Sequence, residues 1–316
     1  MGVPFFLAPM AEISHRAFRE LIEDFGGCDT YFSEMISAAA LLADGLFEKW
    51  YIDNAPNPKK HVFQLVGADP QAISRAATLL DKLECAGIDI NMGCSAPLIR
   101  KTGAGVAWMA SIDSAGELIS KVRPQVKSRL SVKLRIGFKD DFDYLVRFCR
   151  RLEDEGVELI TLHPRTATEK FKRTARWSYV GALKKELKIP VAGNGDISNA
   201  QELNRRAEAG LTSGLCDAVM VGRAAVRQPW IFADAKGKKV TVTFLEVGLR
   251  FLELLALHQP PEFYISRARR FFSFFCDNLK WGNYLKNQLN REETLSGVER
   301  VWREYFKENE ETLKCY

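Results

Sequence analysis

Short apolar runs alternate with amphipathic segments along most of the chain. Eight of these runs have the length of buried strands, and they span residues 5–8, 31–33, 61–65, 88–90, 131–134, 159–162, 190–192 and 218–221. Segments between them, such as 15–25 and 144–152, carry apolar residues at three- and four-residue steps, which predicts helices with one buried face. Parallel strands need crossover helices, and eight of them can close into a cylinder without an exposed edge. The pattern therefore predicts an α/β fold, a (β/α)8 TIM barrel.

The pattern changes after Gly237. Strand-like alternation stops there, and an aromatic-rich helical pattern continues to Tyr316. This change predicts two domains, a TIM barrel over residues 1–236 and a small C-terminal α-helical bundle over residues 237–316. A chain of 316 residues with 47% hydrophobic content is large enough to bury a core in each.

Composition excludes several classes of protein. No apolar stretch approaches the ~18 residues that span a bilayer, and no basic region precedes an apolar one at the N-terminus, so we expect a cytoplasmic protein with no membrane segment. The 7 cysteines are scattered and include no C-x-x-C pair, which argues against a disulfide framework and against a metal site. The net charge of +5 is too small to indicate nucleic-acid binding by itself.

The charge is nevertheless uneven, with a basic band over residues 267–291. Asp277 is the one acid in this band, whose basic residues are Arg267, Arg269, Arg270, Lys280, Lys286 and Arg291. Aromatic residues are interleaved with them, namely Phe271, Phe272, Phe274, Phe275, Trp281 and Tyr284. Such aromatics form a helix core more often than a platform for stacked bases, so the band alone is weak support for RNA binding.

Polar residues follow almost every apolar run. In a TIM barrel the carboxyl ends of the strands surround the active site, so these residues are expected at one mouth. They are Pro9 and Met10, Glu34, Gln64, Asn91 and Cys94, Lys133 and Arg135, His163, Asn194, Gly195 and Asp196, and Gly222 and Arg223.

Cys94 is the strongest candidate for chemistry. It lies three residues beyond the end of a strand, on a loop closed by Gly103 and Gly105, whereas cysteines buried for packing usually lie within the apolar run itself. A thiol at the barrel mouth can hand a proton to a carbanion while a hydride arrives from the opposite side.

Two glycine-bounded turns indicate a phosphate-bearing cofactor. The segments GNGD (193–196) and VGRA (221–224) follow the last two strands, where barrels commonly bind phosphate, and Arg223 would add a bidentate clamp. Lys133 and Gln64 would then face the cofactor ring, where a lysine charge stabilises an anionic reduced flavin. For Lys133 the alternative is a buried ion pair with Glu34.

His163 begins a basic loop. Arg165, Lys170, Lys172, Arg173 and Arg176 are opposed by Glu169 alone. A polyanionic substrate that approaches the same mouth would explain both the histidine and this charge, although a strand-end histidine can also be structural.

Taken together, these residues closely resemble the tRNA-dihydrouridine synthase family of FMN enzymes. The resemblance rests on APM (8–10), VFQL (62–65), DINMGCSAP (89–97) with its GAG loop, VKLRIGF (132–138), LHPRT (162–166), VAGNGDI (191–197) and VMVGRAA (219–225), and it runs from Pro4 to about Trp230. The most specific element is N-M-G-C at one strand end combined with K-x-R and H-x-R-T at the next two. The C-terminal segment resembles the family's tRNA-binding domain in position, length and basic character.

The resemblance implies a reaction and a site. NADPH would reduce FMN, the flavin would pass a hydride to C6 of a uridine flipped out of tRNA, and Cys94 would protonate C5 to leave 5,6-dihydrouridine. It implies FMN contacts from Pro9, Met10, Ala11, Gln64, Lys133, His163, Asn194, Gly195, Asp196, Gly222 and Arg223. Asn91 would line the uracil pocket, and further tRNA contacts are expected from Arg135, Arg165, Lys170, Arg267, Arg269 and Arg270.

The chain departs from the family pattern in two places. Ser95 stands where proline often follows the catalytic cysteine, and the loop 170–176 is unusually basic. Neither departure removes a chemical group, so they bear on the position of the substrate more than on activity. We expect a monomer. No dinucleotide-binding fingerprint follows a strand, so the sequence does not distinguish NADPH from NADH as the reductant.

Three alternatives remain open from the residues alone. The first is an FMN barrel that acts on a free pyrimidine, as a dihydroorotate dehydrogenase-like enzyme does, although the basic loops and helical segment argue against it. The second is a Schiff-base lyase with Lys133 as nucleophile. The third is a non-catalytic RNA-binding protein, which would have no use for Cys94, Lys133 and His163 together.

Overall fold

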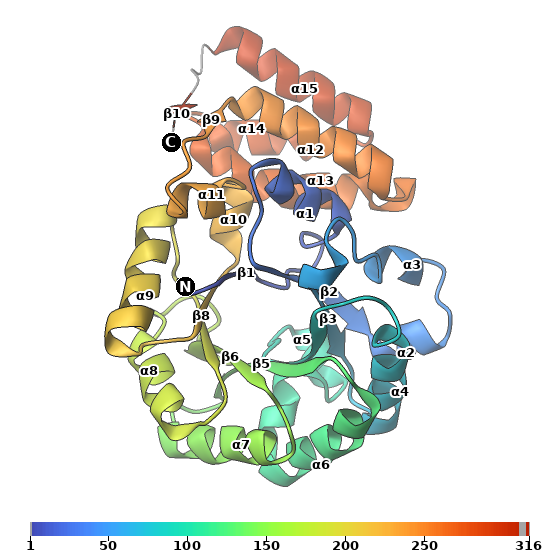
Figure 1. The fold of residues 1–316 in the computed structure, drawn as a ribbon. Helices are drawn as coiled ribbons and strands as arrows, with labels where there is room; N and C mark the ends of the chain where they lie inside the picture. The colour runs from blue at the N-terminus through green and yellow to red at the C-terminus, as the bar shows by residue number, and fades with distance from the viewer. Residues whose placement is uncertain (1, 310–313, 316) are drawn as a thin grey trace.

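Eight parallel strands form a closed barrel in sequence order (Figure 1). The computed structural model describes residues 2–309 and 314–315. The strands are β1 (Phe5–Leu7), β2 (Thr30–Ser37), β3 (His61–Val66), β4 (Gly87–Met92), β5 (Arg129–Gly137), β6 (Leu159–Thr166), β7 (Val191–Asn194) and β8 (Ala218–Val221). Each overlaps the apolar run that predicted it, and the predicted (β/α)8 barrel is confirmed.

Helices connect the strands and cover the outside of the barrel (Figure 1). They are α1 (Arg16–Asp24), α2 (Ala38–Leu42), α3 (Glu48–Tyr51), α4 (Pro70–Leu80), α5 (Pro97–Lys101), α6 (Ile112–Val122), α7 (Phe142–Asp154), α8 (Trp177–Glu186), α9 (Ala200–Ser213), α10 (Arg223–Arg227) and α11 (Ile231–Ala235). Short 3-10 turns lie at Pro58–Lys60, Gly105–Ala110, Arg123–Gln125 and Cys276–Asn278. The helices expected over 15–25 and 144–152 correspond to α1 and α7.

The interior of the barrel is apolar at one end and polar at the other. Phe6, Phe32, Val62, Leu159 and Met220 form a small buried cluster separate from the main core. Inward side chains recur at every second residue of a strand, and further toward the carboxyl ends those of β3, β4 and β5 are polar, namely Gln64, Asp89 and Lys133. The carboxyl end of the barrel therefore presents hydrogen-bonding groups, and the other end is a packed plug.

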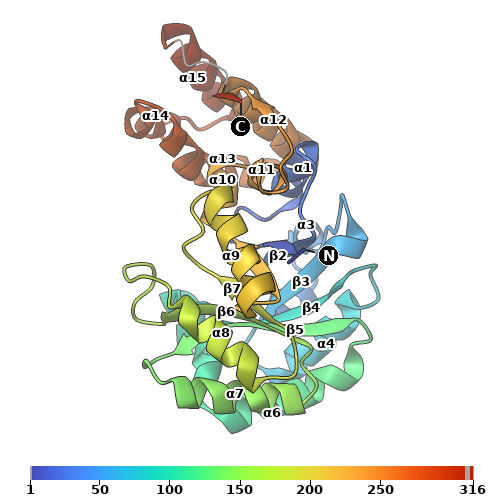
Figure 2. The ribbon, with the colours of Figure 1, turned by 60° about the vertical axis from the view of Figure 1, so that its left-hand side comes forward.

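A helical region rests on one side of the barrel, as Figures 1 and 2 show. It comprises α12 (Phe244–His258), α13 (Pro261–Phe275), α14 (Gly282–Leu289) and α15 (Leu295–Glu308). Helix α12 packs on α1, and α13 packs on α10. The antiparallel pair β9 (Thr241–Val242) and β10 (Lys314–Cys315) was not predicted, since two-residue strands leave no alternation to detect. The helical region itself is confirmed, whereas the division into two domains stays a prediction.

The aromatic residues of the basic band mostly form the core of this region. The rings of Phe251 and Phe271 stack with centroids 3.8 Å apart, and Phe272 and Phe275 are buried beside them. Trp281 remains exposed to solvent. For the buried phenylalanines of α13, these contacts confirm the prediction that the aromatic residues form a helix core.

A buried ion pair joins the helical region to the barrel. Arg267 of α13 donates to Glu34 of β2 over 2.9 Å, and both side chains are less than 4% exposed. Burial raises the pKa of Glu34 from its usual value, and Arg267 opposes that shift. The other carboxylate oxygen of Glu34 accepts the backbone N–H of Glu12 over 2.5 Å, in the loop after β1. One carboxylate thus connects the helical region, β2 and the loop that follows β1.

Arg267 is expected to carry much of the stability of this junction. The variant Arg267→Met leaves Glu34 buried without its cation, and removal of one partner of a buried pair costs about 3 kcal/mol of unfolding free energy. Arg270→Met is the matched control, because Arg270 forms a 3.0 Å pair with Glu12 at the surface and such pairs contribute about 0–1 kcal/mol. Urea denaturation measures both variants. Equal losses in the two would contradict the assignment.

Candidate active site

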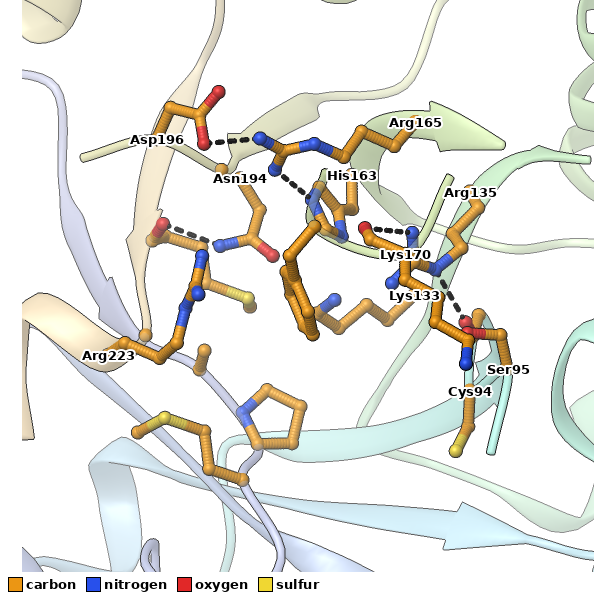
Figure 3. Close-up of a pocket in the computed structure, with 18 of the residues that line it drawn as sticks. Cys94, Ser95, Lys133, Arg135, His163, Arg165, Lys170, Asn194, Asp196 and Arg223 are labelled. Atoms are coloured by element: carbon orange, nitrogen blue, oxygen red, sulfur yellow. Dashed lines mark hydrogen bonds and ion pairs between the residues drawn. The ribbon is translucent and has the colours of Figure 1, made fainter. Parts of the chain in front are cut away.

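A cavity of about 820 Å³ opens at the carboxyl ends of the strands (Figure 3). Its volume is typical of sites for cofactors and small ligands. Phe274 and Asp277 of the helical region stand at its rim. The sequence-predicted residues that line it are Pro9, Met10, Asn91, Cys94, Lys133, Arg135, His163, Arg165, Lys170, Asn194, Gly195, Asp196, Gly222 and Arg223.

Five predicted residues lie apart from the cavity lining. Ala11 is exposed on the loop after β1, and Gln64 is fully buried inside the barrel. Arg269 donates to the backbone oxygen of Glu292, and Arg270 pairs with Glu12 at the surface. Arg267 is 1% exposed, because its guanidinium is turned inward to Glu34, so it offers no surface to an RNA.

Positive charge gathers at one end of the cavity. Figure 3 shows Arg165 and Arg223 at this end, with Asp196 as the carboxylate bonded to Arg165 over 2.6 Å, and Lys133 nearer the middle of the cavity. Desolvation lowers the pKa of Lys133 to about 8, and the nearby charge of Arg135 adds to that shift. Desolvation and mutual repulsion also lower the pKa of Arg223. This end of the cavity is therefore suited to an anion, whose charge would relieve the repulsion.

His163 is neutral in this setting. Burial lowers its pKa well below the ordinary value, and the surrounding cations, Lys133 first, lower it further. Its Nε2 lies 3.0 Å from a nitrogen of Arg165, which can only donate, so Nε2 accepts and the proton is on Nδ1. A neutral His163 can thus donate one hydrogen bond without adding charge.

The turn after β7 packs closely against His163 at the basic end of the cavity. Gly195 has φ of 122°, and a Cβ there would approach the ring of His163 to 3.0 Å, so only glycine fits. Asp196 adopts a left-handed φ of 55° and is held by Arg165 and by the backbone N–H of Ala175 over 2.7 Å. The turn therefore has a defined shape before any ligand binds.

Cys94 lies across the cavity from Arg223 (Figure 3). The side-chain oxygen of Asn91 accepts the N–H groups of Gly93 over 3.1 Å and of Cys94 over 2.9 Å, which turns the chain sharply at the end of β4. Gly105 approaches from the other side, and a Cβ there would lie 2.6 Å from the carbonyl oxygen of Cys94. The half-buried thiol is thus held on a fixed loop opposite the basic end.

The loop after β6 contributes a residue that sequence reasoning missed. Phe171 lies over the cavity, with its ring centroid 4.3 Å from the guanidinium of Arg223 and 5.9 Å from the ring centroid of His163. A lone aromatic in a basic loop carries no periodic or motif signal, so its place depends on the fold. Arg176, expected to add charge for the substrate, instead binds Glu169 through two bonds of 2.8 and 2.6 Å and lowers the pKa of Glu169 to about 2.

One alternative for a single residue can now be decided. Lys133 was weighed as a partner of Glu34, but Glu34 instead bonds to Arg267 and to the N–H of Glu12.

Among residues 2–309 and 314–315 no helix is long and apolar enough to cross a membrane. Within the same residues no cluster of three His, Cys, Asp or Glu side chains is placed to hold a metal ion.

Comparison with known proteins assigns the family. The model of the family described as dihydrouridine synthase matches residues 6–311, and the chain belongs to that family. A probable tRNA-dihydrouridine synthase from Aquifex aeolicus is 35% identical over 248 residues, which cover 77% of this chain and 75% of that protein. The tRNA-dihydrouridine synthase B of Pasteurella multocida is 31% identical and covers 72% of this chain and 67% of its own.

Solved structures agree on the fold. A complex of 2-naphthoyl-CoA reductase with 2-naphthoyl-CoA superposes with a TM-score of 0.57 at 12% identity, over 74% of this chain and 50% of that one. TcOYE with pHBA gives a TM-score of 0.54 at 10% identity, over 74% of this chain and 89% of its own. At these identities the likeness concerns the barrel architecture.

The basic end of the cavity predicts anion binding by the ligand-free protein. Inorganic phosphate or pyrophosphate should raise the melting temperature, and Arg223→Ala should weaken that binding about tenfold, because hydrogen bonds to charged groups contribute about 1.5–3 kcal/mol. Thermal denaturation at increasing phosphate concentration measures both. Arg205→Ala is the control, since Arg205 is exposed on α9 and pairs with Glu202. An equal effect of the two variants would sink the prediction.

Proposed function

We propose that this protein is a tRNA-dihydrouridine synthase that binds FMN, is reduced by NADPH and reduces the 5,6 double bond of uridines in tRNA. One observation carries the proposal, namely that this member of the family places Cys94 at one end of a cavity and the arginines Arg165 and Arg223 at the other. A flavin nucleotide has a matching polarity, with a phosphate at one end and a redox-active ring at the other.

The residues present fit FMN. Arg223 and the turn at Gly195 would hold the phosphate, with Pro9, Met10 and Gly222 along the wall between the two ends. Lys133 would lie near the ring, where its charge favours negative charge on the reduced flavin. Gln64 is buried inside the barrel with its amide bonded to Asp89 and Asn91, so its proposed contact with the ring depends on its remaining amide proton.

The reaction assigns a task to Cys94. Bound reduced flavin supplies the hydride for C6 of the uracil ring. Cys94 would give its thiol proton to C5, which completes 5,6-dihydrouridine, and the thiolate would recover a proton from solvent. Arg135 donates through Nε to the backbone oxygen of Gly93 over 3.0 Å, which ties its guanidinium to the loop that carries Cys94. We infer that it would contact a uracil held beside Asn91.

The substrate must reach the cavity as a single base. A base within a stacked helix cannot enter a barrel mouth, so the target uridine would have to be flipped out of the tRNA. The basic loop around Lys170 and the exposed face of the helical region flank the opening. On that face Arg270 of α13 is exposed, and its pair with Glu12 places it beside the loop after β1. Recognition by phosphate contacts and shape is the mode expected for folded RNA.

Dihydrouridine formation tests this function. Transfer RNA that lacks dihydrouridine is incubated with the protein and NADPH, and its nucleosides are analysed by mass spectrometry. The wild type should convert a uridine to a product two hydrogens heavier, and Cys94→Ala should bind flavin and accept electrons from NADPH normally while RNA turnover falls by about 100-fold or more. Loss of flavin from that variant would mean that Cys94 is structural. No product from a wild type with reducible flavin would indicate a small-molecule substrate.

The affinity for FMN should depend on pH through Lys133. A lysine is charged below its pKa and neutral above it. The attraction to FMN should therefore weaken as the pH rises through the pKa of Lys133, which is about 8 in the ligand-free protein and would be higher beside the anionic cofactor. Lys133→Arg keeps the charge and should remove this dependence between pH 7 and 9. Quenching of flavin fluorescence on titration into the flavin-free protein gives the affinity. The same decline in both proteins would refute the role of Lys133.

A further inference from the structure

A row of buried polar side chains runs through the barrel behind Cys94. Ser131 on β5 donates to one oxygen of Asp89 on β4 over 2.6 Å. The other oxygen of Asp89 accepts the side-chain amide of Gln64 on β3 over 2.7 Å, and the oxygen of Gln64 accepts the amide of Asn91 over 2.8 Å. Asp89 and Gln64 are fully buried, and neither lines the cavity.

The direction of every bond in this row follows from its two ends. At one end the N–H groups of Gly93 and Cys94 can only donate, so the oxygen of Asn91 must face them. The amide nitrogen of Asn91 is then turned to Gln64, whose oxygen must accept it. The amide nitrogen of Gln64 is left facing Asp89, and a carboxylate oxygen there accepts it. An acceptor at position 89 is the group that makes the whole row consistent.

We propose that Asp89 is a positioning residue for Cys94, acting through the amide orientations of Gln64 and Asn91. Its effect on catalysis rests on the proposed function, whereas its effect on the loop does not. Without an acceptor at position 89 the amide of Gln64 can turn over, and its nitrogen then faces the nitrogen of Asn91. The amide of Asn91 then loses the hydrogen bond that fixes its orientation, and the turn that carries Cys94 becomes more mobile.

The charge of Asp89 is separable from its role as acceptor. Burial raises its pKa to about 6, and the groups that face it are Ser131, Gln64, and the cations Lys133 and Arg129 of β5. Asp89→Asn removes the charge but keeps an oxygen that can face Gln64, while its nitrogen can donate to the hydroxyl of Ser131. Asp89→Leu has a similar shape and removes both. The two variants therefore distinguish an acceptor from a countercharge for Lys133.

The first measurement needs no cofactor. Hydrogen exchange of the amides of Gly93 and Cys94 in the flavin-free protein reports whether the oxygen of Asn91 still accepts them. We expect exchange about tenfold faster in Asp89→Leu and unchanged exchange in Asp89→Asn. If Asp89→Leu does not fold, Gln64→Met interrupts the same row one step later and should give the same increase. Unchanged exchange in both Asp89→Leu and Gln64→Met would overturn the proposal.

The second measurement follows the reaction. In a single turnover, Asp89→Leu should slow the oxidation of reduced flavin by RNA about 10- to 100-fold, as expected for a displaced reacting group, whereas reduction by NADPH should fall much less because that step does not use Cys94. In a Cys94→Ala background the same substitution should cause no further loss, because Asp89 acts through Cys94. A full additional loss there, or an equal loss in Asp89→Asn, would contradict the proposal. Failure of the wild type to oxidise its flavin with RNA would instead reject the proposed function and leave the exchange result standing.

Discussion

Closure of eight parallel strands places every second side chain inside the barrel, and the rest of the structure depends on how those side chains are satisfied. At the amino-terminal end they are apolar and pack into a plug around Phe32 and Leu159. At the carboxyl end they are polar, and each buried polar group costs free energy unless it finds a partner. Asp89 and Gln64 find partners in one another and in Ser131 and Asn91. The cavity floor is thereby rigid, and groups at the mouth remain available to ligands.

The same requirement explains the attachment of the helical region. Glu34 is buried within β2, and Arg267 supplies its counter-ion from a helix more than 200 residues away along the chain. Because Glu34 also holds the loop after β1, which borders the cavity, the placement of the helical region and the shape of the cavity are linked through one carboxylate. The proposed function, in which the helical region contacts an RNA that the barrel reduces, would use such a fixed relation between the two.

The sequence predicted the barrel well because its signal is local. Each strand is an apolar run, and each run overlaps a strand of the structure. Of the fourteen proposed site residues that line the cavity, the strand-end rule collected twelve, and the basic loop after His163 supplied Arg165 and Lys170. The failures involve side chains whose surroundings come from distant segments. Arg267 was expected at a basic surface, yet a helix arginine facing a buried glutamate has the same local sequence as an exposed one. Phe171 and the pairing of Arg176 with Glu169 depend likewise on how a loop folds back.

The central claim is that electrons pass from a flavin in this cavity to a uridine in RNA. The most direct test mixes the anaerobically reduced flavoprotein with tRNA that lacks dihydrouridine and follows the flavin absorbance near 450 nm through one turnover. The account predicts that the absorbance returns and that one dihydrouridine forms for each flavin oxidised. A flavin that stays reduced in the presence of this RNA, but is oxidised by a free pyrimidine, would contradict it.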